Sequence, residues 1–577
     1  MKRLMVIPLL LLLTVTLTAC GGKKEDNLWS EGASGKEKME ESTTEETAVT
    51  DKGQGHQKKE EEAADGQMGQ AELQNGKSSV EPLEVLLTDR YLEKWSDTES
   101  GEWDESYTRL CMVTWQELVL SAECARDYPQ LAKTLQEKNK EFEGHSHDSM
   151  DYLLPLAQEA YDYEIEFGSG SFYPFSGDSK LSVQRGDNLI VSVRQDFNEY
   201  SGGVHGLYGT IGMNYDSVTG EELLITDVLT DISSLPARLS EKIMETYGDE
   251  YETYESLQGY LKEEYEPEDY NWTMSYQGIT FYFNPYEIAS YSEGMIRTTL
   301  WFDEIPELVK EKYTEVPVGG YAMALPLGQH IDVDLNPNDG KRDWIAATSF
   351  YKSEEEKEYG FQRLSIGRSD YWHQGEEDYG YEFIPYLVCV GEPGKERYYI
   401  YVEGNVENDF STLYIYDLNG EDISACEPIP GVGFTGYWEE KVGEDGTYYN
   451  KVLLEPRSFE LGTRIHILGT WTGRKIYAAD SESGIPEPET EYYSIKNNEY
   501  PLVSKLPIEV LMLPGKSREE LPAGTSFYIL RTDGESYVDA CLEDGRECRI
   551  EVEYVDWEYR LKGISEWDCF EELFYAG

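Results

Sequence analysis

Two turn-forming stretches constrain the fold of this chain more than any other feature. The run GGVHG at residues 202–206 places three glycines around a histidine, and glycine lets a backbone adopt positive φ or approach another segment closely. The run TFYFNPYEIASYSEG at residues 280–294 begins with β-forming residues and reaches an Asn-Pro pair, which ends strands. β-forming residues resume at 295–302. The pattern predicts strands joined by turns, and turns on a rigid sheet often carry binding residues.

The second turn carries four residues suited to contact with a partner: Tyr286, Glu287, Tyr291 and Glu293. Tyrosine offers rigid apolar area with a polar tip, and glutamate pairs with cations on a partner. The alternative places Tyr286 and Ile288 in the core and leaves both glutamates in solvent. His205 also has two interpretations. It is either a general base, which requires an orienting carboxylate, or a residue that holds the glycine-rich turn by hydrogen bonding.

Both stretches, in this order, resemble the RsiV-type extracytoplasmic domain across roughly residues 105–315. That domain occurs on membrane-bound anti-sigma factors that sense lysozyme, and ahead of the catalytic domain in PdaC-type peptidoglycan deacetylases. The resemblance implies lysozyme or wall glycan (peptidoglycan) as the ligand of a non-enzymatic binding module. It also prompts a second hypothesis, a peptidoglycan-modifying enzyme or an accessory domain of one. Residues 316–577 lack the metal-binding Asp/His motif of the deacetylase catalytic domain, and no nucleophile elbow, zinc helix or complete phosphate loop occurs.

The first twenty residues predict where the protein works. Lys2 and Arg3 precede an apolar run at residues 4–17, and LTAC at residues 17–20 matches a lipobox. We expect lipidation of Cys20, which would anchor the protein to the outer face of the cell membrane. The alternative is a plain secretory signal with a chance cysteine. Because the lipobox occupies this position, we expect no cytoplasmic sigma-binding segment before the anchor.

Composition separates a tether from the folded part and limits the partners. Residues 21–80 are polar and nearly free of aromatic residues, which predicts a disordered tether. The chain has 49 Lys and Arg against 113 Asp and Glu, a formal net charge of −64, which excludes nucleic-acid binding because phosphate contact needs a basic surface. The charge favours cationic partners such as lysozyme. The alternative is that the acidity only keeps the surface hydrated.

Beyond the tether, the chain predicts an α+β fold in three parts. Residues 81–315 read as a sheet with packed helices, including one helix that begins at Pro129 and a second at 149–167. Residues 316–480 read as a β-rich domain that contains an acidic loop. Residues 481–577 read as a small all-β domain, either an SH3-like barrel or a sandwich.

Eight cysteines occur, and lipidation of Cys20 leaves seven. Cys541 and Cys548 flank an Asp-Gly pair, a sequence typical of two-residue hairpin turns. Such a turn would place the two cysteines opposite each other with Cα atoms about 5.5 Å apart, which permits a disulfide. The alternative leaves every thiol reduced.

The acidic loop offers the one cofactor hypothesis, which is calcium. Oxygen-bearing side chains fall at positions 1, 3, 5, 7 and 12 of the calcium-loop template. These residues are Asp332, Asp334, Asn336, Asn338 and Asp343. Position 6 is Pro337 where the template has glycine, so the alternative is a polar β-turn without metal.

Lipidation gives the first testable prediction. Cys20→Ala should move the protein from the membrane fraction to the medium or leave it unprocessed, because the acyl chains that anchor it attach to this sulfur. Cell fractionation followed by detergent extraction measures the outcome. A mature, detergent-extractable C20A protein would show that the lipobox assignment is wrong.

Overall fold

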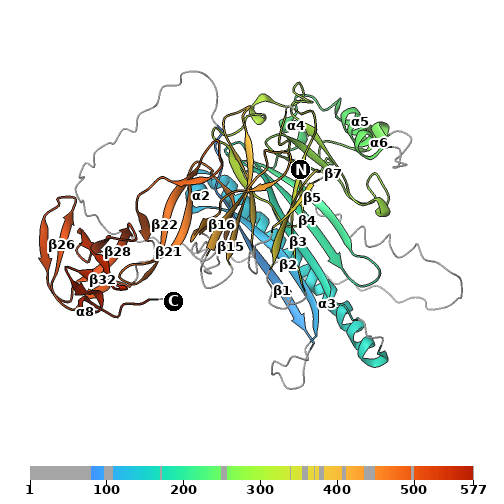
Figure 1. The fold of residues 1–577 in the computed structure, drawn as a ribbon. Helices are drawn as coiled ribbons and strands as arrows, with labels where there is room; N and C mark the ends of the chain where they lie inside the picture. The colour runs from blue at the N-terminus through green and yellow to red at the C-terminus, as the bar shows by residue number, and fades with distance from the viewer. Residues whose placement is uncertain are drawn as a thin grey trace, which may run out of the picture. The chain divides into compact units, whose positions relative to one another are not determined.

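The computed structural model describes residues 80–96, 108–168, 172–248, 257–337, 339–353, 362–369, 371–375, 383–405, 411–434, 449–495 and 500–575 (Figure 1). The predicted signal peptide, Cys20 and the predicted tether up to residue 79 lie outside these ranges. Strand makes up 46% of the structure and helix 19%, so β-structure dominates, and the helices concentrate before residue 270. In the described ranges, no helix is both long enough and apolar enough to cross a membrane.

One twelve-stranded sheet joins strands from both sides of residue 315. Its order is β17-β16-β15-β14-β9-β20-β1-β2-β3-β4-β5, and β18 pairs with β16. The strands are β1 (Val85–Trp95), β2 (Arg109–Leu120), β3 (Phe175–Gly186), β4 (Ile190–Tyr200), β5 (Leu207–Asp216), β9 (Tyr321–Ala324), β14 (Pro385–Val390), β15 (Arg397–Asn405), β16 (Ser411–Asp417), β17 (Ser424–Ala425), β18 (Ile429–Pro430) and β20 (Asn450–Leu454). Because β20 pairs with both β1 and β9, it links the N-terminal strands to those that follow residue 315.

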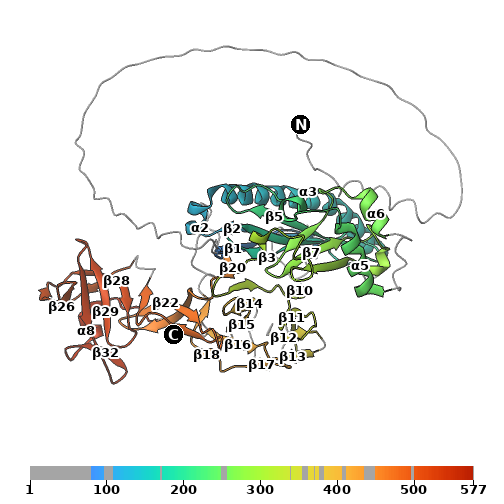
Figure 2. The same cartoon turned by 90° about the horizontal axis from the view of Figure 1, so that it is seen from above.

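The short helix α2 (Ala122–Asp127) and the long helix α3 (Pro129–Phe167) connect β2 to β3, which run parallel. Parallel neighbours need a long crossover, and a helix supplies it. Figure 2 shows α3 lying along one face of the sheet, where it packs on β2 and β3. The side chain of Asn139 exchanges two hydrogen bonds of 3.0 Å with the backbone of Leu118, which fixes the helix to β2.

The bounds of α3 follow from its terminal residues. Proline stands in the first turn, where no backbone N–H is needed, and the helix ends at Gly168 with φ of 65°, a left-handed conformation that glycine adopts at little cost. The predicted start at Pro129 is confirmed. The predicted division near residue 149 is wrong, because the helix runs unbroken through that region. Gly144 costs a helix only about 1 kcal/mol relative to alanine, and the buried Leu135 and Met150 hold both sides of it on the sheet.

A second layer is built from residues 225–301. Helices α4 (Ile225–Val228), α5 (Leu235–Tyr247) and α6 (Leu257–Glu264) precede a three-stranded antiparallel sheet of β6 (Trp272–Met274), β7 (Gly278–Phe283) and β8 (Ile296–Trp301). Helix α5 packs on β8, and the layer has a hydrophobic core of its own. That core includes Leu239, Ile243, Ile279, Phe281 and Leu300.

Two asparagine side chains join this layer to β5, the edge strand of the large sheet. The amide of Asn284 accepts from the Thr210 N–H at 2.7 Å and donates to the Thr210 carbonyl at 3.1 Å. The amide of Asn271 donates to the same carbonyl at 2.7 Å and accepts from the Gly212 N–H at 2.6 Å. An edge strand exposes unpaired backbone groups, and here side chains satisfy them instead of a further strand.

Gly212 permits the close approach of the two layers. A Cβ at this position would overlap the backbone carbonyl of Trp272 on β6. Beside it, Asn214 donates to the same carbonyl at 2.8 Å. Because the obstacle is backbone and not a flexible side chain, only glycine fits.

A buried ion pair closes the turn between β3 and β4. Arg185 donates from Nε to the Asp187 carboxylate at 2.7 Å, and both side chains are fully buried. The same guanidinium donates to the Tyr313 carbonyl at 2.5 Å and lies 4.8 Å from the centre of the Tyr276 ring. Asp187 in turn accepts from the Leu189 N–H at 2.8 Å. These contacts tie the turn to Tyr276 of the second layer and to the segment that follows that layer.

The remaining strands form open sheets. β10 (His330–Asp332), β11 (Trp344–Phe350), β12 (Arg363–Arg368) and β13 (Tyr371–Gln374) make one sheet. A larger sheet has the order β19-β21-β22-β24-β28-β29-β30-β26-β27, with β23, β25 and β34 off this path. Its strands are β19 (Gly433–Phe434), β21 (Phe459–His466), β22 (Thr470–Ala479), β23 (Pro486–Pro488), β24 (Tyr493–Ile495), β25 (Leu502–Ser504), β26 (Ile508–Leu513), β27 (Arg518–Leu521), β28 (Ser526–Thr532), β29 (Tyr537–Leu542), β30 (Glu547–Glu551) and β34 (Phe570–Glu571).

Near the C-terminus, β31 (Glu553–Val555), β32 (Glu558–Leu561) and β33 (Ile564–Ser565) form a small sheet, followed by α8 (Glu566–Cys569). The described part of residues 481–577 is therefore β-rich, as expected, and its strands pair as open sheets. The SH3-like barrel that the sequence suggested is not seen in these residues.

The expected pairing of Cys541 with Cys548 is wrong. Cys541 lies opposite Glu547, and Cys548 lies opposite Ala540. The Leu542 N–H donates to the Arg546 carbonyl at 2.8 Å, so the turn contains three residues instead of two. One extra residue shifts the register, and a shift by one residue turns the side chain to the other face of a strand. Cys548 is accordingly buried while Cys541 is partly exposed, and all seven cysteines in the described residues are free.

The contact at Gly212 yields a stability prediction with a matched control. Gly212→Ala should lower the free energy of unfolding by about 2 kcal/mol or more, because the new methyl group forces two backbones apart. Gly144→Ala, on α3 with open space around its Cβ position, should raise it by about 0.5–1 kcal/mol. Denaturant unfolding of both variants measures the difference. A G212A protein as stable as the parent would contradict the close approach of β5 and β6.

Candidate functional site

The two turns singled out by the sequence meet in the structure. The run at residues 202–206 connects β4 to β5, and the run at 284–294 connects β7 to β8. The Tyr291 hydroxyl donates to the Gly206 carbonyl at 2.6 Å. The rings of His205 and Tyr291 pack with centroids 4.4 Å apart and planes 31° apart. Side chains separated by more than eighty residues in the sequence are thereby in direct contact.

Two further tyrosines complete an aromatic cluster. Tyr208 meets the Tyr291 ring edge-on at 5.7 Å, and Tyr286 lies at the same centroid distance with a tilt of 32°. Tyr286 is 57% exposed and Val204, at the tip of the first turn, is 97% exposed. We call this region the two-turn surface. It comprises Val204, His205, Tyr208, Tyr286 and Tyr291.

Tyr286 adopts a backbone conformation that is rare for its residue type. Its φ is 74°, in the left-handed region. Its N–H donates to the Ala289 carbonyl at 3.0 Å, which closes the turn around it. A bulky residue in this region costs on the order of 1–3 kcal/mol, and such strain concentrates at sites of function. The turn therefore holds a strained tyrosine with its ring largely in solvent, while the neighbouring Ile288 is buried in the core.

The two glutamates of the second turn have different surroundings. Glu293 accepts from the Ser290 N–H at 2.7 Å and so caps the short 3₁₀ helix η2 (Tyr291–Glu293). Glu287 is partly buried and accepts from the Asn284 amide at 3.3 Å. Burial raises the pKa of the Glu287 carboxyl, and the hydrogen bonds from Asn284 oppose the rise. Both carboxylates therefore support the shape of the turn.

The geometry around His205 fits the hydrogen-bonding interpretation. Its Nδ1 lies 3.2 Å from the Gly206 carbonyl oxygen, its ring packs against the Tyr291 ring, and the residue as a whole is exposed. In the part of the chain that the structure describes, no carboxylate makes a hydrogen bond to His205. A general base needs such an orienting group. His205 thus contributes a ring face to the two-turn surface.

A groove of about 500 Å³ adjoins the first turn. Its walls come from α3, from residues 172–175 and from the end of β4. They include Glu159, Tyr163, Glu164, Phe172, Tyr173, Phe175, Tyr200, Gly202 and Gly203. Tyr163 is 61% exposed and Tyr173 is 66% exposed. Exposed rings and carboxylates therefore continue from the two-turn surface along α3.

The proposed calcium loop holds its carboxylates in contact with cationic and polar side chains. Asp332 accepts from Arg297 at 3.1 Å and from the Thr299 hydroxyl at 2.7 Å. Asp334 accepts from Arg342, and Asp343 accepts from the Ser369 hydroxyl at 2.6 Å. Each carboxylate therefore already has partners.

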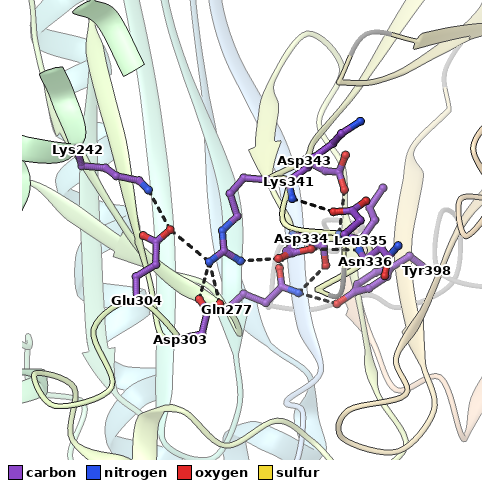
Figure 3. A network of polar contacts seen from close by, with 12 residues as sticks. Lys242, Gln277, Asp303, Glu304, Asp334, Leu335, Asn336, Lys341, Asp343 and Tyr398 are labelled. Atoms are coloured by element: carbon purple, nitrogen blue, oxygen red, sulfur yellow. Dashed lines mark hydrogen bonds and ion pairs between the residues drawn. The ribbon is translucent and has the colours of Figure 1, made fainter. Parts of the chain in front are cut away.

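Figure 3 shows the network of hydrogen bonds and ion pairs around Asp334. The network also contains Asp303, Glu304, Lys242 and Gln277. Asn336 donates its backbone N–H to Asp334 at 3.1 Å. Burial raises the pKa of Asp334, and the Arg342 guanidinium opposes the rise. Asn338 lies outside the described residues. Among the residues that are described, no group of three or more His, Cys, Asp or Glu side chains is placed to hold a metal ion.

The sequence did not reveal the roles that several residues play in shaping these sites. Tyr208 lies two residues after the glycine-rich run, and its position there was the available signal. Glu293 belongs to a Ser-x-x-Glu capping box that the sequence displays at residues 290–293. Arg297 and Arg342 gave no signal, because their roles depend on contacts made only in the folded chain.

Calcium remains a prediction, and the structure sharpens its test. Calcium would have to displace Arg297 and Arg342 from the loop carboxylates. Adding calcium to the chelated protein should raise the melting temperature, because a ligand that binds only the native state stabilises it. Asp332→Asn should remove that rise. An unchanged melting temperature at millimolar calcium would show that the loop binds no calcium and is a polar turn closed by ion pairs.

Comparison with known proteins identifies one segment of the chain. A family model described as a protein of unknown function (DUF3298) matches residues 224–303, which contain the second layer and its turn at 284–294. Two solved structures of this family are similar. One, from Bacteroides fragilis, is 19% identical over 40% of this chain and 96% of its own, with a TM-score of 0.29. The other, from Pseudomonas aeruginosa PAO1, is 17% identical over 40% of this chain and 97% of its own, with a TM-score of 0.25. No curated protein matches the chain. Residues 224–303 are thus a DUF3298 domain.

Proposed function

We propose that this chain is a non-enzymatic binding module of the cell envelope that recognises lysozyme or wall glycan. It is held by lipid at Cys20 on the outer face of the cell membrane. The observation that carries the proposal is the two-turn surface, where exposed rings from two distant turns are fixed side by side. A strained Tyr286 presented to solvent supports a role in recognition, because such strain has no evident structural benefit at an exposed position.

The aromatic character of the surface supports binding of either ligand. Tyrosine is enriched among the residues that dominate protein interfaces, and it loses little conformational entropy when it binds. Its ring also offers an apolar face and a polar tip to a sugar ring. The groove beside the first turn extends this surface with Tyr163 and Tyr173, two further exposed rings.

The charge of the chain favours lysozyme over wall glycan as the ligand. The net charge of −64 steers a basic protein toward the chain, and Glu159 and Glu164 line the adjoining groove. The resemblance to the extracytoplasmic domain of lysozyme-sensing anti-sigma factors rests on the same two turns. In this proposal His205, Tyr286 and Tyr291 make the contact, while Glu287 and Glu293 hold the turn that presents them.

The proposal predicts specific binding of lysozyme at physiological salt. Lysozyme should bind at least tenfold more tightly than cytochrome c, a basic protein of comparable charge, because charge alone cannot distinguish the two. Tyr286→Ala should weaken lysozyme binding about tenfold, the typical loss for a central interface tyrosine. Calorimetric titration of the purified chain measures both, and the melting temperature of Y286A should stay close to that of the parent.

Tyr554→Ala is the matched control for this experiment. Tyr554 is 56% exposed and packs on one other tyrosine, as Tyr286 does, but it lies on β31. Its loss should leave lysozyme binding within twofold of the parent. If both basic proteins bind with equal affinity, and both affinities fall together as salt shortens the Debye length, the interaction is only bulk electrostatic attraction and the proposal is wrong. A parallel titration with peptidoglycan fragments tests the glycan ligand on the same variants.

A further inference from the structure

We infer that the C-terminal β-sheet carries a binding site for a phosphate group, in a cavity of about 510 Å³ lined by four cationic side chains. The cavity lies where the β26–β27 turn meets β28, β30 and the β29–β30 turn. Its walls are Leu513, Pro514, Lys516, Arg531, Gly545, Arg546, Glu547 and Arg549. Four cations around one cavity stand out in a chain with 113 acidic and only 49 basic residues.

Strand pairing places two of these cations in one row across the sheet. Arg531 on β28 lies opposite Asp539 on β29, which lies opposite Arg549 on β30. Asp539 is fully buried and accepts from Arg531 at 2.8 Å and from Arg549 at 2.6 Å. One carboxylate thus orients two guanidinium groups. Preorganised guanidinium groups lose little freedom when they bind an oxyanion.

The guanidinium groups keep hydrogen-bond donors that no described residue uses. Arg531 donates from Nε and Nη2, and Arg549 donates from Nε and Nη2, which leaves Nη1 of each without a partner in the described residues. Arg546 donates from Nε to Asp544 and from Nη1 to Glu519. Its Nη2 therefore also has no hydrogen-bond partner in the described residues.

The fourth cation completes the donor set. Lys516 is exposed, and among the described residues it forms no ion pair. Donors from four side chains suit a tetrahedral phosphate better than a planar carboxylate, which one guanidinium fork satisfies. A phosphate offers several oxygens and a charge of about −1 as a diester or about −2 as a monoester.

Local charge and size agree with such a ligand. The four cations are balanced by four carboxylates, Glu519, Asp539, Asp544 and Glu547, so the cavity lacks the strong negative charge of the chain as a whole. Its volume falls in the range of small-molecule sites, about 300–1,000 Å³, and exceeds what a lone phosphate ion fills. The phosphate therefore belongs to a larger molecule, either a small phosphate ester or a phosphodiester polymer.

The test uses the full chain and two probes, inorganic phosphate and poly(glycerol phosphate), titrated calorimetrically at constant ionic strength. Phosphate should bind saturably, and acetate should compete at least tenfold more weakly. Arg546→Gln and Lys516→Gln should each weaken phosphate binding about tenfold or more. Both positions are exposed, so their melting temperatures should remain near that of the parent, which separates loss of binding from loss of fold.

Arg518→Gln is the matched control. Arg518 is half exposed, as Arg546 is, and it also pairs with two carboxylates, but it does not line the cavity. The affinity of the R518Q protein for phosphate should stay within twofold of the affinity of the parent. Tighter binding of the polymer at equal phosphate concentration would identify a phosphodiester chain as the ligand, and equal binding would identify a small ester. Absence of saturable binding, equal competition by acetate, or an equal loss in R518Q would overturn the inference.

Discussion

The hydrogen bonds of Asn271 and Asn284 to the edge of β5 are the contacts on which the candidate site depends. They satisfy the backbone of Thr210 and Gly212, which would otherwise be free to pair with another chain. Because Asn284 also begins the turn after β7, the residue that covers the edge strand also sets where that turn lies. The turn before β5 and the turn after β7 are brought into contact as a consequence.

Glycine residues and the strained backbone of Tyr286 then explain why aromatic rings are exposed where the two turns meet. The missing side chain of Gly212 lets β6 approach β5, and the glycine-rich run lets His205 reach the Tyr291 ring. The left-handed conformation at Tyr286 turns its ring outward while Ile288 anchors the turn in the core. Buried contacts hold the two turns rigidly and leave the aromatic rings exposed. Such a surface suits recognition, because it loses little conformational entropy when a partner binds.

The sequence predicted the local features of this arrangement better than the long-range ones. The glycine-rich run, the strand that stops at Asn284 and the start of α3 follow from short-range preferences of proline, glycine and β-forming residues. That the two turns touch could not be read from the sequence, since it depends on amide contacts between residues more than fifty positions apart. The two errors have different causes, one local and one long-range. One extra turn residue moved Cys541 out of line with Cys548, and core contacts carried α3 through its expected break.

The central claim is that both turns act as one recognition surface, and hydrogen–deuterium exchange of the chain with and without lysozyme tests it most directly. We expect backbone amides at residues 201–208 and 284–294 to exchange more slowly together in the complex. The exposed segment at residues 553–557, which contains β31 and the turn after it, should be unchanged. Protection of only one turn, or of neither, would contradict the account.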